Sequence, residues 1–164
     1  MSYEDGPILL VEDDQVDAMC FERALRGAGF GNPLEKVQKA AEARGYLDGQ
    51  GKFADRQRFP FPNLVVLDLT LPDENGLELL GWMRQKEHSQ ELPVVILDGR
   101  GGPDEIAEAK RLRANGYHAK PSDPDELRDL VSRMMEFWLV GGWFRKKTRR
   151  VTSSTLVPPR VNNE

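Results

Sequence analysis

The fold is decided by the stretch LVVLDLTLPDENG, which runs from residue 64 to residue 76. Its first four residues are apolar, as expected of a buried strand, and Asp68 follows them directly. Pro72 and Gly76 then bracket a turn before a helix. An acidic side chain at the carboxyl end of a buried strand lies where open α/β sheets bind their ligands. The stretch therefore predicts an α/β fold with a functional site at Asp68.

A second acidic cluster closes an apolar run near the start of the chain. Glu12, Asp13 and Asp14 follow the apolar residues 8–11. If the two strands are parallel neighbours, several carboxylates meet, which is unfavourable unless a cation joins them or one is protonated. Asp13 or Asp14 could instead cap the next helix, and for an isolated acidic pair we favour the cap. Together with Asp68, the pattern indicates a divalent-metal site.

Strands and helices alternate along the rest of the chain. Further strands are expected at residues 34–38, 63–68, 94–97 and 117–119. Helices are expected at residues 14–29, 39–48, 77–88 and 104–114, and from residue 123 or 124 onward. Five strand-then-helix units predict a parallel sheet covered by helices on both faces, with right-handed crossovers. The last two strands end at Asp98 and Lys120, so charge gathers at one edge of the sheet.

Apolar spacing predicts which helix faces are buried. In the first helix these positions are Val16, Met19, Cys20, Ala24 and Leu25. In the last helix they are Leu127, Leu130, Val131, Met134 and Phe137. Because Cys20 is the single cysteine, no intramolecular disulfide can form, and we expect it to have a packing role.

The composition is that of a soluble globular protein. Of 164 residues, 39% are hydrophobic and 30% are charged, which fits one domain with a core and a tail. No apolar stretch approaches the roughly 20 residues that span a bilayer, and the first residues are acidic. We therefore expect a cytoplasmic protein without membrane contact.

The charge is distributed unevenly. Residues 145–164 hold six basic side chains and one acid, so this tail carries +5. Because the whole chain carries −4, residues 1–144 carry −9. An acidic body argues against nucleic-acid binding by the main domain. For the basic tail, we favour a solvated segment over an anionic partner.

Three motifs in order resemble the receiver domain of two-component response regulators. They are VEDD at residues 11–14, LDLTLPDENG at 67–76 and GYHAKP at 116–121. The resemblance covers about residues 7–140 and implies a flavodoxin-like (βα)5 fold with strand order 2-1-3-4-5. It is greatest to single-domain regulators of phytochrome-type histidine kinases, because of the long loop before the third strand and the ending Phe137–Leu139. We expect a receiver domain at residues 1–144 and a tail or dimerisation arm at 145–164.

The resemblance also implies roles for particular residues. Asp68 matches the phosphoacceptor, and Lys120 matches the lysine that pairs with the acids and then with the phosphoryl oxygens. Tyr117 matches the aromatic switch that turns inward on activation, although an ordinary surface aromatic stays open as an alternative. Pro121 resembles a proline that follows a cis peptide bond. The implied ligands of Mg²⁺ are Asp13, Asp68, the carbonyl group of Thr70 and, through water, Glu12.

Asp98 departs from the family pattern. The family has Ser or Thr here, whose hydroxyl group bonds the phosphoryl group, and a carboxylate cannot donate unless it is protonated. Two hypotheses restore the function. Asp98 could bind the metal or carry a proton, or Arg100 could contact the phosphoryl group instead.

Several functions therefore compete. We favour a signalling protein, not an enzyme, that accepts a phosphoryl group at Asp68 from a histidine kinase, perhaps one of the phytochrome type. A receiver-shaped interaction module, with phosphorylation impaired by Asp98, is the alternative. A haloacid dehalogenase phosphatase lacks the second Asp, because Thr70 occupies its place, and a Rossmann domain lacks the glycines after the first strand.

The end of the chain is rich in apolar side chains. They are Phe137, Trp138, Leu139, Val140, Trp143 and Phe144. This is more apolar surface than one edge of a small domain hides, and exposed patches of this kind usually bind something. We therefore expect a homodimer formed through the final helix and the C-terminal segment. His88 and His118 lack partners at ligand spacing, so we expect solvated or hydrogen-bonded histidines.

Overall fold

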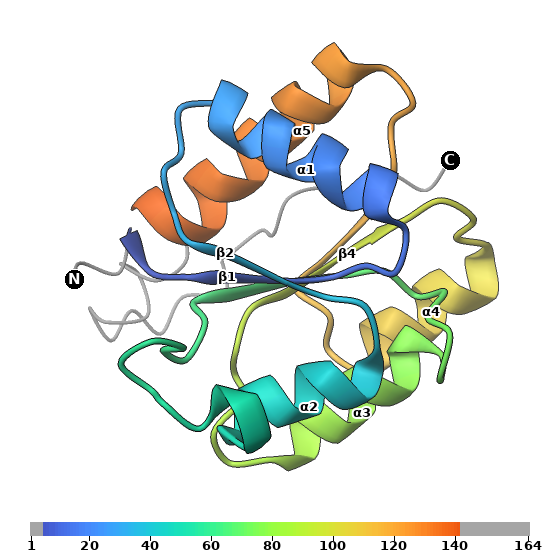
Figure 1. Cartoon of the computed structure of the whole chain (residues 1–164). Helices are drawn as coiled ribbons and strands as arrows, with labels where there is room; N and C mark the ends of the chain where they lie inside the picture. Colours follow the sequence, from blue (N-terminus) through green and yellow to red (C-terminus); the bar gives the residue numbers. More distant parts are fainter. Residues whose placement is uncertain (1–4, 142–164) are drawn as a thin grey trace.

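A computed structural model describes residues 5–141 (Figure 1). Five parallel strands form one sheet in the order β2-β1-β3-β4-β5. Their bounds are β1 Ile8–Val11, β2 Leu34–Val37, β3 Leu64–Leu67, β4 Val94–Asp98 and β5 Gly116–Ala119. The expected fold and strand order are confirmed. The order reverses between β1 and β3, which is where such sheets bind ligands at their carboxyl ends.

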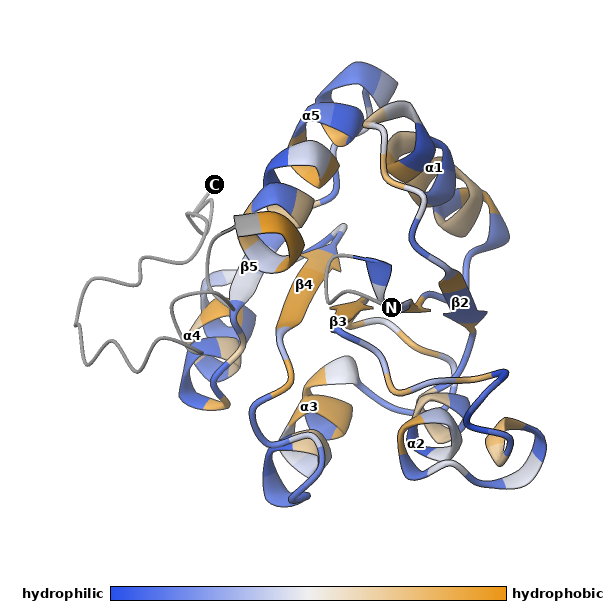
Figure 2. Ribbon diagram, turned by 90° about the vertical axis from the view of Figure 1, so that its left-hand side faces the viewer, coloured by the Kyte–Doolittle hydropathy of each residue, from blue (hydrophilic) through white to orange (hydrophobic). Residues whose placement is uncertain are grey.

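Helices cover both faces of the sheet. On one face lie α1 (Gln15–Gly27) and α5 (Pro124–Met135), which run side by side in Figures 1 and 2. The other face is covered by α2 (Ala40–Asp48), α3 (Gly76–Gln85) and α4 (Pro103–Arg111). A 3-10 helix, η2 (Gly51–Phe53), lies in the loop before β3, and a π-helical turn, η3 (Glu136–Gly141), follows α5. The third helix ends three residues earlier than expected.

The strands are apolar on both faces because helices cover both (Figure 2). Alternate side chains enter two separate cores. The core under α2, α3 and α4 takes Leu9, Val11, Val65, Leu67, Val94 and Ile96. The core under α1 and α5 takes Ile8, Leu10, Leu64, Val66, Val95 and Leu97. The register pairs Val11 with Leu67 and Leu67 with Ile96, so β1, β3 and β4 end at nearly the same level.

The predicted buried face of α1 was partly wrong. Ala24 and Leu25 are buried as expected, and Cys20 is half-buried against the same core. Val16 and Met19, however, are 61% and 43% exposed. The helix buries a stripe that is centred on Phe21, and this large side chain turns the two expected residues toward solvent.

The apolar ending was also partly wrong. Trp138 is only 2% exposed and Leu139 only 3%, and both pack into the core under α1 and α5. The π-helical turn changes the helical period after Met135, so these side chains turn toward the sheet. Phe137 is partly buried, and Val140 remains exposed. Trp143, Phe144 and the basic tail lie outside the described residues. Between residues 5 and 141, no helix is long and apolar enough to cross a membrane.

Candidate functional site

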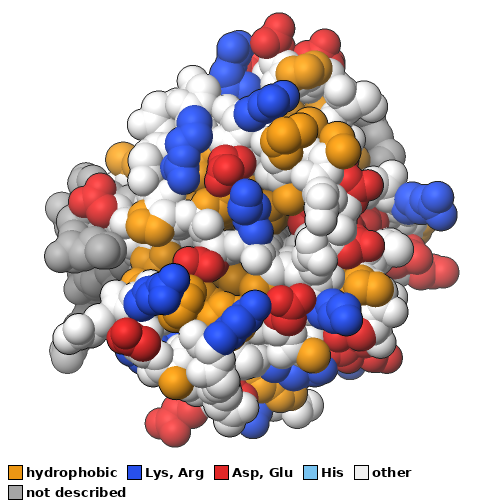
Figure 3. All heavy atoms as spheres, in the orientation of Figure 1, with side chains coloured by type: hydrophobic (Ala, Val, Ile, Leu, Met, Phe, Trp, Pro, Cys, Tyr) orange, Lys and Arg blue, Asp and Glu red, His pale blue; other side chains and the backbone are white. Residues whose placement is uncertain are grey.

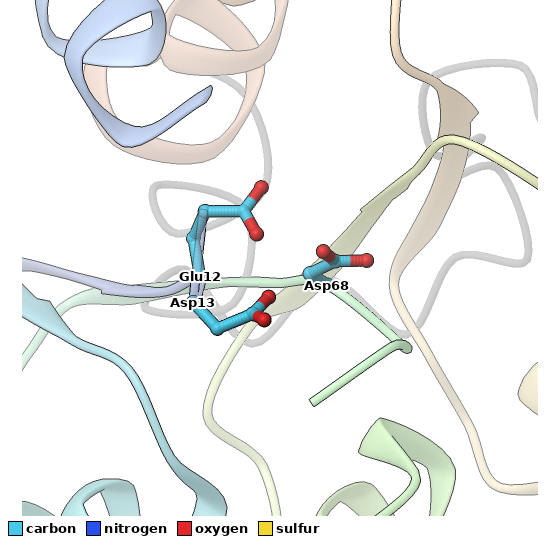
Figure 4. A group of neighbouring side chains, drawn as sticks. All are labelled: Glu12, Asp13 and Asp68. Atoms are coloured by element: carbon cyan, nitrogen blue, oxygen red, sulfur yellow. The ribbon is translucent and has the colours of Figure 1, made fainter. Parts of the chain in front are cut away.

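Three carboxyl groups meet where β1 and β3 end. Each of Glu12, Asp13 and Asp68 offers an oxygen atom, and these atoms lie within 4.8 Å of one another. Figure 4 shows the carboxyl groups of Glu12 and Asp13 on the side of β1 that faces Asp68. Glu12 and Asp68 are buried, whereas Asp13 is exposed. The structure therefore brings the expected acidic cluster together.

Asp14 has a different role. Its Oδ1 atom accepts hydrogen bonds from the backbone N–H groups of Val16 at 2.9 Å and Asp17 at 3.0 Å. This carboxyl group is therefore the N-cap of α1. The two readings of the acidic pair are thereby divided between neighbours, because Asp13 faces the cluster and Asp14 caps the helix.

Lys120 neutralises part of this negative charge. Its Nζ atom pairs with Glu12, donates to Asp17 Oδ2 at 3.0 Å and donates to Asp68 Oδ2 at 3.2 Å. These partners come from β1, α1 and β3, so one cation joins three elements. The sequence reading missed Asp17. The signal that could have found it is an acid in the first turn of a helix that begins beside the site.

Crowding shifts the acidities at the site. Burial, followed by the neighbouring Asp68, raises the pKa of Glu12 to about 8. For Asp68, burial acts upward, but the carboxyl groups of Glu12 and Asp98 and the charge of Lys120 lower its pKa overall. For Lys120, burial acts downward, but contacts with Glu12 and Asp17 raise its pKa overall. Asp68 therefore stays ionised beside a charged Lys120, as a nucleophilic carboxylate requires.

Asp98 lies buried at the end of β4, on the other side of Asp68. Its Oδ2 atom accepts from the Tyr117 hydroxyl group and from the backbone N–H of Arg100, both at 3.3 Å. Burial, followed by the charge of Asp68, raises the pKa of Asp98. Tyr117 is 3% exposed, so it is not a surface aromatic. The Arg100 residue as a whole is exposed.

The donor set fits a hard divalent cation. Carboxylate oxygens are the ligands that Mg²⁺ and similar ions prefer, and an exposed acid at the rim leaves room for retained water. Two of the three groups are buried at a distance at which like charges repel, so a cation relieves the repulsion. We conclude that this edge of the sheet is a candidate divalent-metal centre.

A cavity of about 400 Å³ opens beside the cluster. It lies between α1 and α5, and Leu10, Val66 and Leu97 contribute its apolar side. Asp68 and Lys120 also line it. The carboxyl group of Asp68 is therefore reached from this side of the sheet.

Three other expected features differ from the structure or refine it. The described residues contain no cis peptide bond, so the Lys120–Pro121 bond is trans, the form that Xaa-Pro bonds prefer by about 0.5–1 kcal/mol. His88 pairs with Asp48 at 2.8 Å. His118 is neither solvated nor hydrogen-bonded within the described residues, because it points from β5 into the core. Burial lowers its pKa to about 4.

The family follows from comparison with known proteins. A model of the response regulator receiver domain matches residues 8–132. The chain belongs to the response regulator receiver family. Response regulator Rcp1 of Synechocystis sp. is 31% identical over 142 residues, which cover 85% of this chain and 95% of that protein. The probable methanogenesis regulatory protein FilR2 of Methanothrix harundinacea is 33% identical over 141 residues, covering 84% and 85%.

Solved structures agree with this assignment. The phosphorylated cyanobacterial phytochrome response regulator RcpA superimposes with a TM-score of 0.74 at 31% identity, covering 81% of this chain and 93% of that one. The Mn²⁺-bound form of response regulator Rcp1 gives a TM-score of 0.72 at 27% identity, covering 94% and 99%. Response regulator RPA3017, from red light signaling of R. palustris, gives 0.78 at 26% identity, covering 84% and 96%.

This response regulator receiver is thus related to phytochrome response regulators, as the motifs predicted. The comparisons place it among proteins of two-component signalling. They give no support to the alternative of a phosphorylation-impaired module. They also replace the phosphatase and nucleotide-binding alternatives with a receiver.

Proposed function

We propose that Asp68 accepts a phosphoryl group from a histidine kinase, and that the chain passes on a signal through protein contacts. The observation that carries this proposal is the convergence of three acids within 4.8 Å, with Lys120 Nζ at 3.2 Å from Asp68. The lowered pKa of Asp68 supports its role as the nucleophile. The chain acts as the acceptor in this transfer and is not proposed to be an enzyme in the usual sense.

The transfer divides into roles for particular residues. An oxygen of Asp68 attacks phosphorus, the bond from phosphorus to the imidazole nitrogen breaks, and that nitrogen keeps the electron pair. Lys120 already contacts Asp68 and can pair with the phosphoryl oxygens that arrive there. Glu12, Asp13 and the carbonyl group of Thr70 would hold Mg²⁺, which when bound neutralises charge on the phosphoryl group.

Asp98 and Tyr117 form the proposed response to the phosphoryl group. The raised pKa of Asp98 favours its protonated form, which can donate a hydrogen bond to a phosphoryl oxygen. Tyr117 reports the state of Asp98 because its hydroxyl group bonds that carboxyl group directly. We propose that Tyr117 is the switch residue of this receiver.

The proposed partners follow from the surface near the site. Val16 and Met19 are exposed on α1, whose first turn also supplies Asp17 to the site. An apolar patch beside the nucleophile suits the packing of a kinase helix. Because the relatives include phytochrome response regulators, we propose a kinase of the phytochrome type and a cytoplasmic location.

The homodimer also remains a proposal. Within the described residues its support is reduced to Val140 and the partly buried Phe137. We propose a receiver domain at residues 1–144 and an arm at residues 145–164. On the face that Figure 3 shows, Lys and Arg side chains are interspersed with Asp and Glu side chains, and we propose no nucleic-acid or membrane partner.

Intact mass after incubation with a small phosphodonor and Mg²⁺ tests the proposal. Purified protein should gain one phosphoryl group, and the gain should vanish in Asp68→Asn and after metal removal with EDTA. Mass gain in Asp68→Asn equal to that of the unaltered protein would show that another residue is the acceptor. No gain in the unaltered protein, with either a donor or a phytochrome-type kinase, would contradict the proposed function.

A further inference from the structure

The segment that links β3 to α3 is closed at its base by backbone contacts. Thr70 and Asn75 form an isolated antiparallel bridge, and the Gly76 N–H donates to the Leu69 carbonyl at 2.8 Å. A Cβ atom on Gly76 would lie 2.5 Å from the carbonyl oxygen of Asp68, so this approach requires glycine. The base of the β3–α3 segment is therefore held against the end of β3.

The tip of the same segment is bound to a different helix. Asp73 accepts hydrogen bonds from the first N–H groups of α2, through Oδ1 from Ala40 and through Oδ2 from Ala41, both at 3.0 Å. Desolvation of Asp73 opposes these contacts, but the N–H groups of Ala41 and Ala40 lower its pKa overall. The residue at the N-cap position of α2 is Lys39, whose side chain makes no capping hydrogen bond. Asp73 therefore supplies the cap that α2 lacks.

A second contact reinforces this attachment. Glu74 forms an ion pair with Arg44 of α2, and the side chain of Glu74 is largely shielded from solvent. The Arg44 guanidinium group also lies 5.5 Å from the ring centroid of Trp82 in α3. The tip of the β3–α3 segment is thus fixed to α2 by two successive carboxylates.

We propose that Asp73 is a positioning residue for the metal centre. It anchors the tip of the β3–α3 segment to α2 and thereby keeps the carbonyl group of Thr70 directed at a cation held by Asp13 and Asp68. The inference deepens the proposed function and rests on it, because Thr70 is a ligand only in that proposal. Groups that orient metal ligands without touching the metal contribute to metal affinity, and their loss costs about tenfold to a hundredfold.

The competing explanation is that Asp73 only stabilises α2. The chain offers a way to separate the two roles. Lys39→Ser places a side-chain acceptor at the N-cap position of α2 itself, which restores the cap without joining the helix to the β3–α3 segment. Asp73→Asn removes the same charge as Asp73→Ala but keeps an oxygen that accepts one of the two N–H groups.

Mn²⁺ affinity and the melting temperature are measured together, the first from the electron paramagnetic resonance signal of free Mn²⁺. We expect Asp73→Ala to bind Mn²⁺ about tenfold more weakly than the unaltered protein and clearly more weakly than Asp73→Asn. Adding Lys39→Ser to Asp73→Ala should raise the melting temperature without restoring the affinity.

Two results would overturn the inference. In the first, Asp73→Ala and Asp73→Asn have equal Mn²⁺ affinity, so that only the lost charge matters. In the second, the added Lys39→Ser restores affinity together with the melting temperature, so that the role is confined to α2. A failure of the proposed function looks different, because the unaltered protein then binds Mn²⁺ no better than Asp68→Asn does.

Discussion

The hydroxyl group of Tyr117 donates to Asp98 Oδ2 at 3.3 Å, and the ring is buried between β5 and the loop after β4. The approach depends on the backbone of that loop. A Cβ atom at Gly101 would lie 1.8 Å from the Tyr117 hydroxyl oxygen. The inward position of Tyr117 thus requires both an acceptor at Asp98 and the missing side chain of Gly101.

Gly101→Ala should expel Tyr117 from this position. The ring is expected to become accessible, because the new methyl group occupies the place of the hydroxyl oxygen. Nitration by tetranitromethane, located by peptide mass, measures this accessibility. Gly99→Ala is the matched control, because a Cβ atom there meets nothing within 4 Å. Equal nitration of Tyr117 in both variants would contradict the packing described here.

Asp98→Thr should accelerate phosphorylation by a small donor. An ionised carboxyl group beside Asp68 repels the incoming phosphoryl group, and removing about 1.4 kcal/mol of repulsion gives a rate gain of about tenfold. Because the pKa of Asp98 is raised, the gain should be larger at pH 8, where more of it is ionised, than at pH 6.

The rates come from intact mass over time, expressed as the ratio of variant to unaltered protein at each pH. This ratio removes the effect of pH on the donor. Asp104→Asn, an exposed acid in the first turn of α4, controls for net charge and should leave the rate unchanged. A slower Asp98→Thr variant would instead mean that the carboxyl group is required for the transfer.

His118 should make the protein less stable in acid. Its pKa is about 4 in the folded chain and 6.5 when unfolded, so between these values the unfolded state binds the proton and the folded state does not. Stability is therefore unaffected above pH 6.5 and decreases as the pH falls, by about 2 kcal/mol at pH 5.

Urea unfolding at pH 7 and pH 5 measures this loss. His118→Leu should abolish the part of the pH dependence that His118 causes and, by removing a buried polar ring without partners, add about 1–2 kcal/mol at pH 7. The other histidine provides the control, because His88→Gln alters an exposed pair and should keep the loss between pH 7 and pH 5. The same pH dependence in His118→Leu and the unaltered protein would refute this assignment.

Asp13 and Asp14 should separate metal binding from helix capping. Asp13→Asn is expected to remove most of the rise in melting temperature that Mg²⁺ produces, with little change in its absence, because Asp13 is exposed and belongs to the acidic cluster. Asp14→Ala should cost about 1 kcal/mol through loss of the α1 cap and keep the response to Mg²⁺. Thermal unfolding with and without Mg²⁺ distinguishes them, and an equal loss of response in both variants would contradict this division.

The sequence predicted the sheet and the acidic cluster well because both depend on local patterns. Each strand is a short apolar run, and Asp13 and Asp68 come directly after such runs, so the parallel register alone brings them together. Asp98 and Lys120 were found for the same reason. Side chains that stand at strand ends are placed by the fold itself.

The features that the sequence did not predict depend on contacts between distant elements. Asp73 caps a helix 32 and 33 residues away, and nothing in its neighbourhood indicates that partner. Val16 and Met19 fit an amphipathic pattern, but Phe21 determines how α1 sits on the sheet. Trp138 is buried because a π-helical turn changes the helical period at the end of α5.

The ammonium group of Lys120 has three N–H bonds and three carboxylate partners, so its donors are fully engaged. A phosphoryl oxygen that arrives at Asp68 must displace one of them. Asp17 is the partner that gives way most easily, because its side chain is 46% exposed and regains water when it is released. Chemistry at β3 would then be felt in the first turn of α1, where one tether between that helix and the sheet is lost. The lysine thus couples the occupancy of the site to the hold on a surface helix.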